Sequence, residues 1–397
     1  MQRLLNKVFT GLMGLVFRFS SIPSQIVFAG PGCAEQLAKH VARLGYQRVL
    51  VVTDRVLVDL GLAAGFRASL EAAGCEVQIH DGILPDPTDL AVEACLDTLR
   101  AQDSDAIVAL GGGSVIDAAK AMAASATNGP VSQLAGFGKV KNNPIPLFAV
   151  PTTAGTGSEA TIVAVISDAE THKKQFILGA NLLPGAVALD PALQLSMPAS
   201  VTAATGADAL THAIEAYLSR LANDDIRRSA AAAVQTIFHY LPAACSVGDD
   251  IDAREAMALA AYQAGAALNQ GSVGTVHAIA HQLGARYGTP HGVANAVVLP
   301  PVLDCYLPSQ AVPLALLAAK IGVCEASDSE SERALKFIAA VRDLLRDVGL
   351  ASALPDLNQS DINALAVDAE AECRQYPVPY FLSRDELESV LETLIDA

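Results

Sequence analysis

Two short stretches of this sequence have the residue types and the spacing of a transition-metal site. GADALTHAIEAY carries Asp208 and His212, and HAIAHQLGARYGTPHG carries His277, His281 and His291, three of the chain's eight histidines. Residues four apart lie on one face of a helix, so each stretch presents its donors together. We therefore expect the two stretches to form one metal site from a carboxylate and imidazoles.

The ligand types limit the ion that such a site would hold. Imidazoles with one carboxylate suit Fe²⁺, Zn²⁺, Mn²⁺ or Co²⁺ and exclude the all-oxygen sites of calcium and magnesium. Residue 278 is Ala, so the HExxH pattern of zinc proteases, with its glutamate base, is absent. Spacing alone does not decide which histidines are ligands. For each one taken singly, a helix-face histidine with a satisfied hydrogen bond is the alternative.

A glycine-rich loop forms a second candidate site. In DAIVALGGGSVIDAAKAMA a strand leads into Gly111, Gly112 and Gly113, and a helix opens at Ser114. Glycines let the backbone approach an anion, and the N–H groups of a helix N-terminus attract phosphate. Ser114 and Asp117 also have the spacing of a capping box, which binds no ligand.

A second loop and a strand end make a dinucleotide the expected ligand. FAVPTTAGTGSEAT leaves a strand through the hydroxyl donors Thr152, Thr153 and Thr156. Asp54 ends the strand RVLVVTD, where a carboxylate can accept hydrogen bonds from both ribose hydroxyls and repel a 2′-phosphate, which favours NAD over NADP. The GxGxxG fingerprint is absent. A Ser/Thr/Gly turn without a ligand and a helix N-cap at Asp54 are the alternatives.

Taken together, the two sites indicate hydride transfer. A metal would polarise an alcohol oxygen, a nicotinamide would accept the hydride, and a histidine could move the proton. A metal-dependent hydrolase, whose glycine loop holds the phosphate of its substrate, is the alternative from a different class of enzyme.

The elements that must position these residues fall into two halves. Before residue 190, short β-branched runs alternate with amphipathic stretches, which is typical of a mostly parallel α/β sheet. After residue 197 only helical periodicity recurs. We expect an α/β dinucleotide-binding domain at residues 1–196 and an all-helical metal-binding and catalytic domain at residues 197–397. The expected strands are 25–29, 48–53, 76–80, 105–109, 147–150, 161–167 and 186–190.

Composition and charge exclude several classes of protein. Hydrophobic residues make up 52% of the 397 residues and charged residues only 17%, so the chain is globular. Forty-two acidic against 26 basic residues give a formal net charge of -16 without a Lys/Arg cluster, so we expect no nucleic-acid partner. The seven cysteines are scattered and never spaced as CxxC, which indicates reduced thiols in the cytoplasm.

The apolar N-terminal extension, residues 1–20, resembles a signal peptide only superficially. Its apolar run from Val8 to Phe17 is too short to span a bilayer, and no small-x-small cleavage site follows it. We expect an amphipathic segment that packs on the body or on a neighbouring subunit of a homo-oligomer, with no stable membrane insertion.

These motifs resemble those of the iron-containing (group III) alcohol dehydrogenase family. The resemblance covers nearly the whole chain and rests on VVTD, LPDPT, VALGGGSVIDAAKAMA, PTTAGTGSEAT, GADALTHAIEAY and HAIAHQLGARYGTPHGVANAVVLP. It implies a dehydroquinate synthase-like architecture with the two domains given above. It also implies an NAD-dependent oxidoreductase that uses Fe²⁺ and acts on a small alcohol and its aldehyde or ketone.

The resemblance also implies a role for each site residue. The implied metal ligands are Asp208, His212, His277 and His291, and His281 is the catalytic residue, facing the nicotinamide and substrate. Gly112, Gly113 and Ser114 would meet the diphosphate and Asp54 the adenine ribose. The full set expected to bind the cofactor is Asp54, Gly111, Gly112, Gly113, Ser114, Asp117, Thr152, Thr153, Thr156 and Lys174.

Two features bear on how far the resemblance extends. Glycerol dehydrogenase-like and dehydroquinate synthase-like proteins share the architecture but typically use three ligands and zinc. Four filled ligand positions therefore favour iron, with a zinc glycerol dehydrogenase-like enzyme as the alternative. In LPDPT, Asp86 stands where many relatives carry Asn, so it would offer the cofactor an acceptor in place of a donor.

Overall fold

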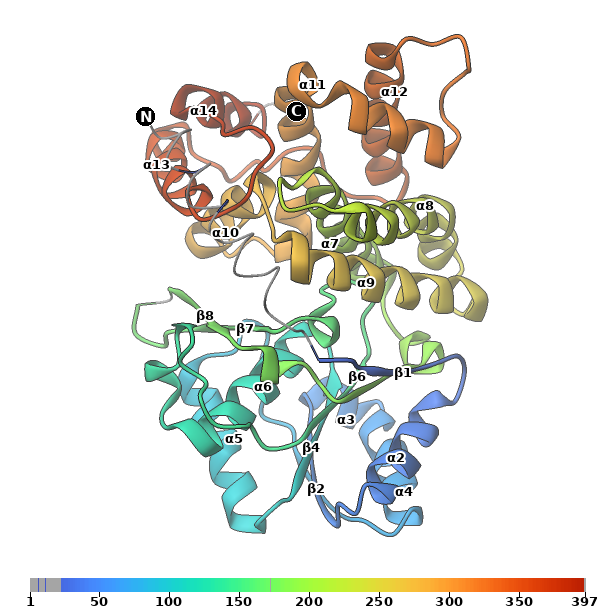
Figure 1. Ribbon diagram of the computed structural model, residues 1–397, viewed down its shortest axis with the longest axis vertical. Helices are drawn as coiled ribbons and strands as arrows, with labels where there is room; N and C mark the ends of the chain where they lie inside the picture. The colour runs from blue at the N-terminus through green and yellow to red at the C-terminus, as the bar shows by residue number, and fades with distance from the viewer. Residues whose placement is uncertain (1–5, 7–10, 12–22, 172, 396–397) are drawn as a thin grey trace. The chain divides into compact units, whose positions relative to one another are not determined.

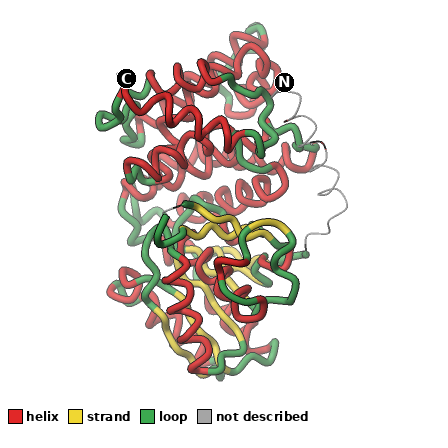
Figure 2. Tube along the Cα trace, turned by 90° about the vertical axis from the view of Figure 1, so that its left-hand side faces the viewer, coloured by secondary structure: helices red, strands yellow, loops and turns green. Residues whose placement is uncertain are grey.

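The computed structural model describes residues 6, 11, 23–171 and 173–395. The chain divides into two compact units, one formed by Ser21–Ser196 and the other by Met197–Ala397 together with the N-terminal segment (Figure 1). Among the described residues, all strands belong to the first unit, whereas the second consists of helices and loops (Figure 2). The expected α/β and all-helical architecture is therefore confirmed.

A six-stranded parallel sheet forms the centre of the α/β unit. Its strands lie in the order β1-β9-β6-β4-β2-β3, and each neighbouring pair is parallel. Every residue of β4 and β6 is buried, as expected for strands that are covered on both faces. The strands are β1 (Ile26–Ala29), β2 (Arg48–Val52), β3 (Glu76–His80), β4 (Ala106–Gly111), β6 (Leu147–Pro151) and β9 (Ala186–Leu189).

Helices cover both faces of this sheet (Figure 1). On one face, α2 (Cys33–Arg43) and α4 (Leu62–Ala72) pack their apolar side chains against β1, β2, β4 and β6. On the other face lie α5 (Asp89–Gln102) and α6 (Gly113–Asn128), which contact each other. The glycine loop thus lies at the carboxyl end of β4, where it leads into α6.

A smaller sheet departs from the expectation that the run at 161–167 joins the parallel sheet. β7 (Val163–Ser167) pairs antiparallel with β8 (Lys174–Leu178), and β8 also pairs with β5 (Gly136–Phe137). The turn between β7 and β8 is short, and Oδ1 of Asp168 accepts hydrogen bonds from the N–H groups of Glu170 and Thr171. Strands joined by so short a turn pair antiparallel, which explains the separate sheet.

The helical unit contains eight α-helices in its described part. They are α7 (Ala199–Leu218), α8 (Asp224–Ser246), α9 (Ile251–Gly271), α10 (Thr275–Tyr287), α11 (His291–Ile321), α12 (Glu330–Asp347), α13 (Ile362–Cys373) and α14 (Arg384–Glu392). Small residues bring some of these helices close together. A Cβ on Gly206 of α7 would lie 2.3 Å from Cδ1 of Leu241 on α8, so glycine permits this contact.

The described part of the chain contains one helix, α11, that is long and apolar enough to cross a bilayer by length and composition. This helix packs against α7, α10 and α12 of the helical unit, and its backbone is non-helical at Gln310. Asn295 near its N-terminus is fully buried and polar. Most of the buried residues of α11 lie in its first half, between Ala294 and Tyr306.

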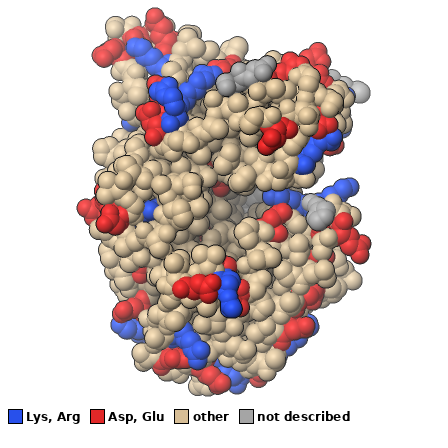
Figure 3. Space-filling model, turned by 180° about the vertical axis from the view of Figure 1, so that it is seen from behind, with Lys and Arg blue, Asp and Glu red and all other residues tan. Residues whose placement is uncertain are grey.

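The predicted packing of residues 1–20 falls almost entirely outside the described residues. Within that segment, Asn6 is buried and its Nδ2 donates to the carbonyl oxygens of Cys373, Arg374 and Tyr376 in the helical unit. On the face shown in Figure 3, acidic and basic side chains are interspersed.

Candidate metal centre and cofactor loops

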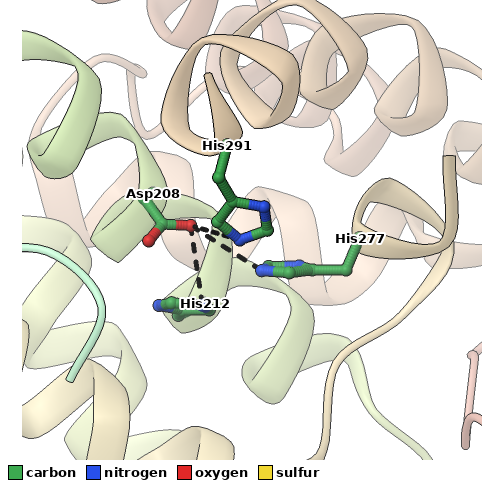
Figure 4. Close-up of side chains that lie close together, drawn as sticks. All are labelled: Asp208, His212, His277 and His291. Atoms are coloured by element: carbon green, nitrogen blue, oxygen red, sulfur yellow. Dashed lines mark ion pairs between the residues drawn. The ribbon is translucent and has the colours of Figure 1, made fainter. Parts of the chain in front are cut away.

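The four residues expected to bind metal converge in the helical unit (Figure 4). Nε2 of His212, His277 and His291 lies 3.6, 3.7 and 3.5 Å from Oδ1 of Asp208. All four donor atoms lie within 4.8 Å of one another. Tetrahedral ligands at about 2.1 Å from an ion are about 3.4 Å apart, so this arrangement fits a first-row divalent metal.

Helix geometry and one close approach explain this convergence. Asp208 and His212 lie one turn apart on α7, His277 lies in the first turn of α10, and His291 is the first residue of α11. A Cβ on Gly292 would lie 2.2 Å from the carbonyl oxygen of Ala204 on α7. Glycine at 292 therefore lets the start of α11 approach α7 one turn before Asp208.

The carboxylates and imidazoles of the site shift one another's pKa values. Burial alone would raise the pKa of the Asp208 carboxyl, but the neighbouring imidazoles of His212 and His291 outweigh it, so the pKa lies far below its usual value. Burial alone would lower the pKa of His277, but the carboxylates of Glu215 and Asp208 outweigh it and raise the pKa to about 9. The site thus favours an ionised carboxylate that needs a positive partner.

Glu215 holds His277, a candidate ligand, from the side opposite to Asp208. Its Oε2 lies 2.7 Å from Nδ1 of His277 and accepts from the N–H of Gly274 at 2.8 Å, while Oε1 accepts from the N–H of Val276. An acceptor at Nδ1 favours the tautomer whose Nε2 lone pair is available to a metal. Glu215 therefore orients an imidazole of the candidate metal site and caps α10 at the same time.

Asn295 lies one turn after His291 on α11 and contacts three of the four candidate ligands. Its Nδ2 donates to Oδ1 of Asp208 at 2.7 Å and lies 3.2 and 3.3 Å from Nε2 of His291 and His277. Its Oδ1 is buried without a hydrogen-bond partner among the described residues. This amide fixes the orientation of the Asp208 carboxylate inside the unit.

His281 lies beside the four-residue cluster without belonging to it. Its ring stacks on His291 with centroids 5.4 Å apart and meets His277 at 5.9 Å and 72°. Its Nδ1 lies 2.6 Å from Oε1 of Glu372 on α13. The structure therefore separates the middle histidine of the motif from its two neighbours, which the spacing alone left open.

The expected cofactor loops meet at the carboxyl ends of adjacent strands in the α/β unit. Gly112 and Gly113 follow β4, and Thr153 and Thr156 follow β6, which pairs with β4. A Cβ on Gly113 would lie 2.6 Å from Cγ2 of Thr156, and one on Gly112 would lie 3.3 Å from Oγ1 of Thr153. Glycine is therefore needed for the two loops to touch.

The capping-box interpretation of Ser114 and Asp117 is wrong. Gly112 is the N-cap residue of α6, and no side chain caps this helix. Oγ of Ser114 accepts instead from the N–H of Asp86 at 3.3 Å. Asp117 turns inward, where its carboxylate accepts from the Ser158 hydroxyl and from the N–H of Val165. Asp117 thus supports the second loop from within.

Lys120 ties the second loop to α6 and was not anticipated from the sequence. Its Nζ is fully buried and donates to the carbonyl oxygens of Ser158, Thr161 and Val163 at 2.6 to 2.8 Å. Burial lowers the pKa of this amine to about 8, against the opposing effect of Asp117. A lone cation in the apolar helix DAAKAMA was the signal that could have revealed it.

Asp54, Gly111 and Thr152 also lie at the carboxyl edge of the parallel sheet, whereas Lys174 belongs to the smaller sheet. Asp54 follows β2, and its Oδ1 N-caps the short helix α3 (Arg55–Asp59) by accepting from the N–H of Leu57. Gly111 ends β4, and its carbonyl oxygen accepts from the N–H of Thr152. Lys174 begins β8, with Nζ 3.8 Å from Oδ1 of Asp86.

Three supporting residues of the helical unit were also missed by the sequence analysis. Glu215 and Asn295 follow ligands at three and four residues, which is helical spacing, so they could have been selected as polar residues on apolar helices. Glu372 lies in AEAECRQY, a segment with no such signal, and its partner His281 is 91 residues away.

Comparison with protein families and curated proteins gives consistent matches over almost the whole chain. The family model "Iron-containing alcohol dehydrogenase" matches residues 23–191, and "Fe-containing alcohol dehydrogenase family, C-terminal" matches residues 202–395. An NAD-dependent methanol dehydrogenase of Bacillus methanolicus is 36% identical over 357 residues, 89% of this chain and 93% of that protein. A 1,3-propanediol dehydrogenase of Klebsiella pneumoniae is 40% identical over 342 residues, 85% and 88% of the two chains.

Solved structures resemble the chain over a similar extent. A crystal structure of a 1,3-propanediol oxidoreductase has a TM-score of 0.91 at 36% identity and covers 94% of this chain and 100% of its own. The sulfoacetaldehyde reductase of Bifidobacterium kashiwanohense, solved in complex with NAD⁺, has a TM-score of 0.86 at 29% identity and covers 94% and 97% of the two chains.

Replacement of Glu215 by Gln tests whether this carboxylate supports the metal site. We expect the affinity of the metal-free protein for Co²⁺ to fall about 10- to 100-fold, because a neutral amide holds the Nδ1 proton of His277 less strongly. Titration followed by the visible absorption of bound Co²⁺ measures this affinity.

Glu370→Gln is the matched control. Glu370 is an equally buried glutamate of the helical unit, with side-chain exposure of 3% against 4% for Glu215, but its partners are Arg374 and Arg384. The Glu370→Gln variant should bind Co²⁺ with unchanged affinity. An unchanged affinity in Glu215→Gln itself would contradict the role given to this residue.

Proposed function

The chain belongs to the iron-containing alcohol dehydrogenase family, and from this membership we propose that it interconverts a small alcohol and its aldehyde or ketone with NAD and Fe²⁺. It is an oxidoreductase with a candidate metal site. The observation that carries the proposal is the convergence of one aspartate and three histidines on a single point in the helical unit. The proposed ligands are Asp208, His212, His277 and His291.

The bound groups would supply the reactive chemistry, and the chain would position them. A divalent ion in this site supplies Lewis-acid polarisation of the substrate oxygen, and NAD accepts or returns the hydride. Asn295 and Glu215 hold the orientation of Asp208 and His277. We assign proton transfer to His281, which lies beside the ligands with its Nδ1 held by Glu372.

Cofactor binding is assigned to the carboxyl edge of the parallel sheet. Ligands of open α/β sheets bind at this edge, and here the loops after β4 and β6 meet while Asp54 follows the neighbouring β2. The proposed contacts to the diphosphate and nicotinamide side are Gly111, Gly112, Gly113, Ser114, Thr152, Thr153, Thr156 and Lys174. Asp117 acts through the second loop, and Asp54 binds the adenine ribose.

Iron is proposed over zinc because four protein donors are available at one point. Zinc enzymes with three protein ligands keep the fourth position open, whereas the cluster here contains four donor residues. The relatives named above act on methanol and on 1,3-propanediol, so the proposed substrates are short alcohols and diols. We also propose a cytoplasmic homo-oligomer without a nucleic-acid partner or stable membrane insertion.

Assay of the anaerobically purified protein tests the proposed reaction. With Fe²⁺ and a panel of primary alcohols, diols and hydroxy acids, we expect a rise in absorbance at 340 nm with NAD and a smaller one with NADP. Metal analysis of the same preparation should find iron.

Two results would contradict parts of this proposal. If the fully active protein contains stoichiometric zinc, the proposal of iron is wrong and the zinc glycerol dehydrogenase-like alternative is favoured. No change at 340 nm with either cofactor, together with release of phosphate from phosphate esters, would favour the metal-dependent hydrolase instead.

Substitution of the histidines separates ligands from the proton-transfer residue. His277→Ala and His291→Ala should each lose both metal and turnover, because each removes a donor from the cluster. His281→Ala should retain the metal while its turnover falls about 10²- to 10⁴-fold, the usual contribution of a positioned acid or base. Metal content per chain and kcat measured on the same samples distinguish the two outcomes.

The matched control for these variants is His239→Ala. His239 lies on α8, and its ring contacts Tyr240 rather than the cluster, so metal content and turnover should stay near wild type. Loss of metal from His281→Ala would show that the ligand assignment is wrong.

Substitution of Asp54 tests cofactor choice. Asp54→Gly and Asp54→Asn should both raise kcat/KM with NADP relative to NAD by about tenfold, because removal of the charge relieves about 1.4 kcal/mol of repulsion toward a 2′-phosphate. Asn preserves the N-cap of α3, so it isolates the effect of charge from that of stability. Unchanged selectivity in both variants would remove the carboxylate from this role.

A further inference from the structure

Two neighbouring imidazoles of α10 each contact a glutamate through Nδ1, a buried one at Glu215 and a half-buried one at Glu372. His277 contacts Glu215 of α7 at 2.7 Å, and His281, one turn later, contacts Glu372 of α13 at 2.6 Å. The first pair belongs to the metal cluster. The second pair contains His281, the histidine of the motif that lies outside this cluster. The role of the Glu372 carboxylate therefore has to be explained separately.

The Glu372 carboxylate is held by three side chains at once. Oε1 accepts from the Tyr376 hydroxyl at 2.6 Å and faces Nδ1 of His281, while Oε2 accepts from Nε2 of Gln282 at 2.7 Å. Both carboxylate oxygens therefore have hydrogen-bond partners, and Glu372 is an immobilised acceptor for Nδ1 of His281.

A purely structural tie between α10 and α13 would not need the contact to His281. Gln282 of α10 already joins the two helices through Glu372, and the Tyr376 hydroxyl, just after α13, holds the same carboxylate. The His281 ring is also stacked on His291, so its plane and its Nδ1 direction are both fixed next to the metal cluster. The contact thus controls which nitrogen of a site histidine carries the proton.

We propose that Glu372 is a positioning residue for His281, holding the proton on Nδ1 so that Nε2 is the nitrogen that accepts and returns the substrate proton. This inference rests on the proposed dehydrogenase function. During oxidation the carbinol hydrogen leaves with both electrons to NAD⁺, and the hydroxyl proton passes to Nε2, directly or through an intervening hydroxyl. Glu372 then faces an imidazolium, whose positive charge it stabilises.

Glu372→Gln tests this role, with Glu370→Gln as the matched control two residues away on α13. In the metal-loaded protein we expect kcat of Glu372→Gln to fall about 10- to 100-fold, with unchanged metal content and a smaller change in KM. Glu372→Asp, which keeps the charge, should recover part of the loss. Glu370→Gln, whose carboxylate contacts arginines only, should stay near wild type.

A measurement that does not depend on turnover reads the tautomer directly. In the zinc-loaded, ¹⁵N-histidine-labelled full-length protein, NMR should show His281 as the Nδ1–H form, identified by the loss of its signals in His281→Ala. Glu372→Gln should shift this histidine toward the Nε2–H form. The wild-type measurement keeps the test decisive even where the variant does not fold.

The outcomes separate this inference from the proposed function. An Nε2–H tautomer in wild type, or a kcat of Glu372→Gln equal to that of Glu370→Gln, overturns the role of Glu372 while leaving the dehydrogenase intact. Absence of NADH formation by the wild-type protein with every alcohol overturns the proposed function instead, and the role of Glu372 in proton transfer with it.

Discussion

The helical unit depends on one electrostatic constraint, the burial of the Asp208 carboxylate. An ionised carboxylate removed from water is costly unless it has hydrogen bonds and a positive partner. Three imidazoles lie 3.5 to 3.7 Å from Oδ1, and the Asn295 amide donates to the same oxygen. These partners come from α7, α10 and α11, so satisfying this charge requires all three helices to converge.

A second constraint acts at the start of α10. The first N–H groups of a helix have no partner within it, and α10 has no side-chain cap of its own. Glu215 accepts from two of these groups as well as from Nδ1 of His277, and a Cβ on Gly274 would lie 2.8 Å from its Oε1. One carboxylate therefore caps a helix and orients a candidate ligand, which couples the folding of α10 to the geometry of the candidate metal site.

The α/β unit also contains a buried charged group, in this case a cation. The ammonium group of Lys120 is fully buried, and the carbonyl oxygens of the second loop surround it. One cation thereby links carbonyl oxygens from three positions of the chain and fixes the end of the loop from inside. Asp117 completes this support through Ser158 and the N–H of Val165. The hydroxyls of Thr153 and Thr156 then lie against the glycine loop.

The sequence predicts the parts of this molecule that depend on local spacing. Apolar runs identified the parallel strands, and residues four apart on one helix identified Asp208 with His212 and His277 with His281. Apolar runs do not indicate which strands pair with each other across a turn. For this reason β7 was expected in the main sheet. The supporting carboxylates depend on contacts between residues 62 and 91 positions apart. No periodicity encodes such a contact, because Glu215 and Glu372 gain their roles only when α7 and α13 pack against α10.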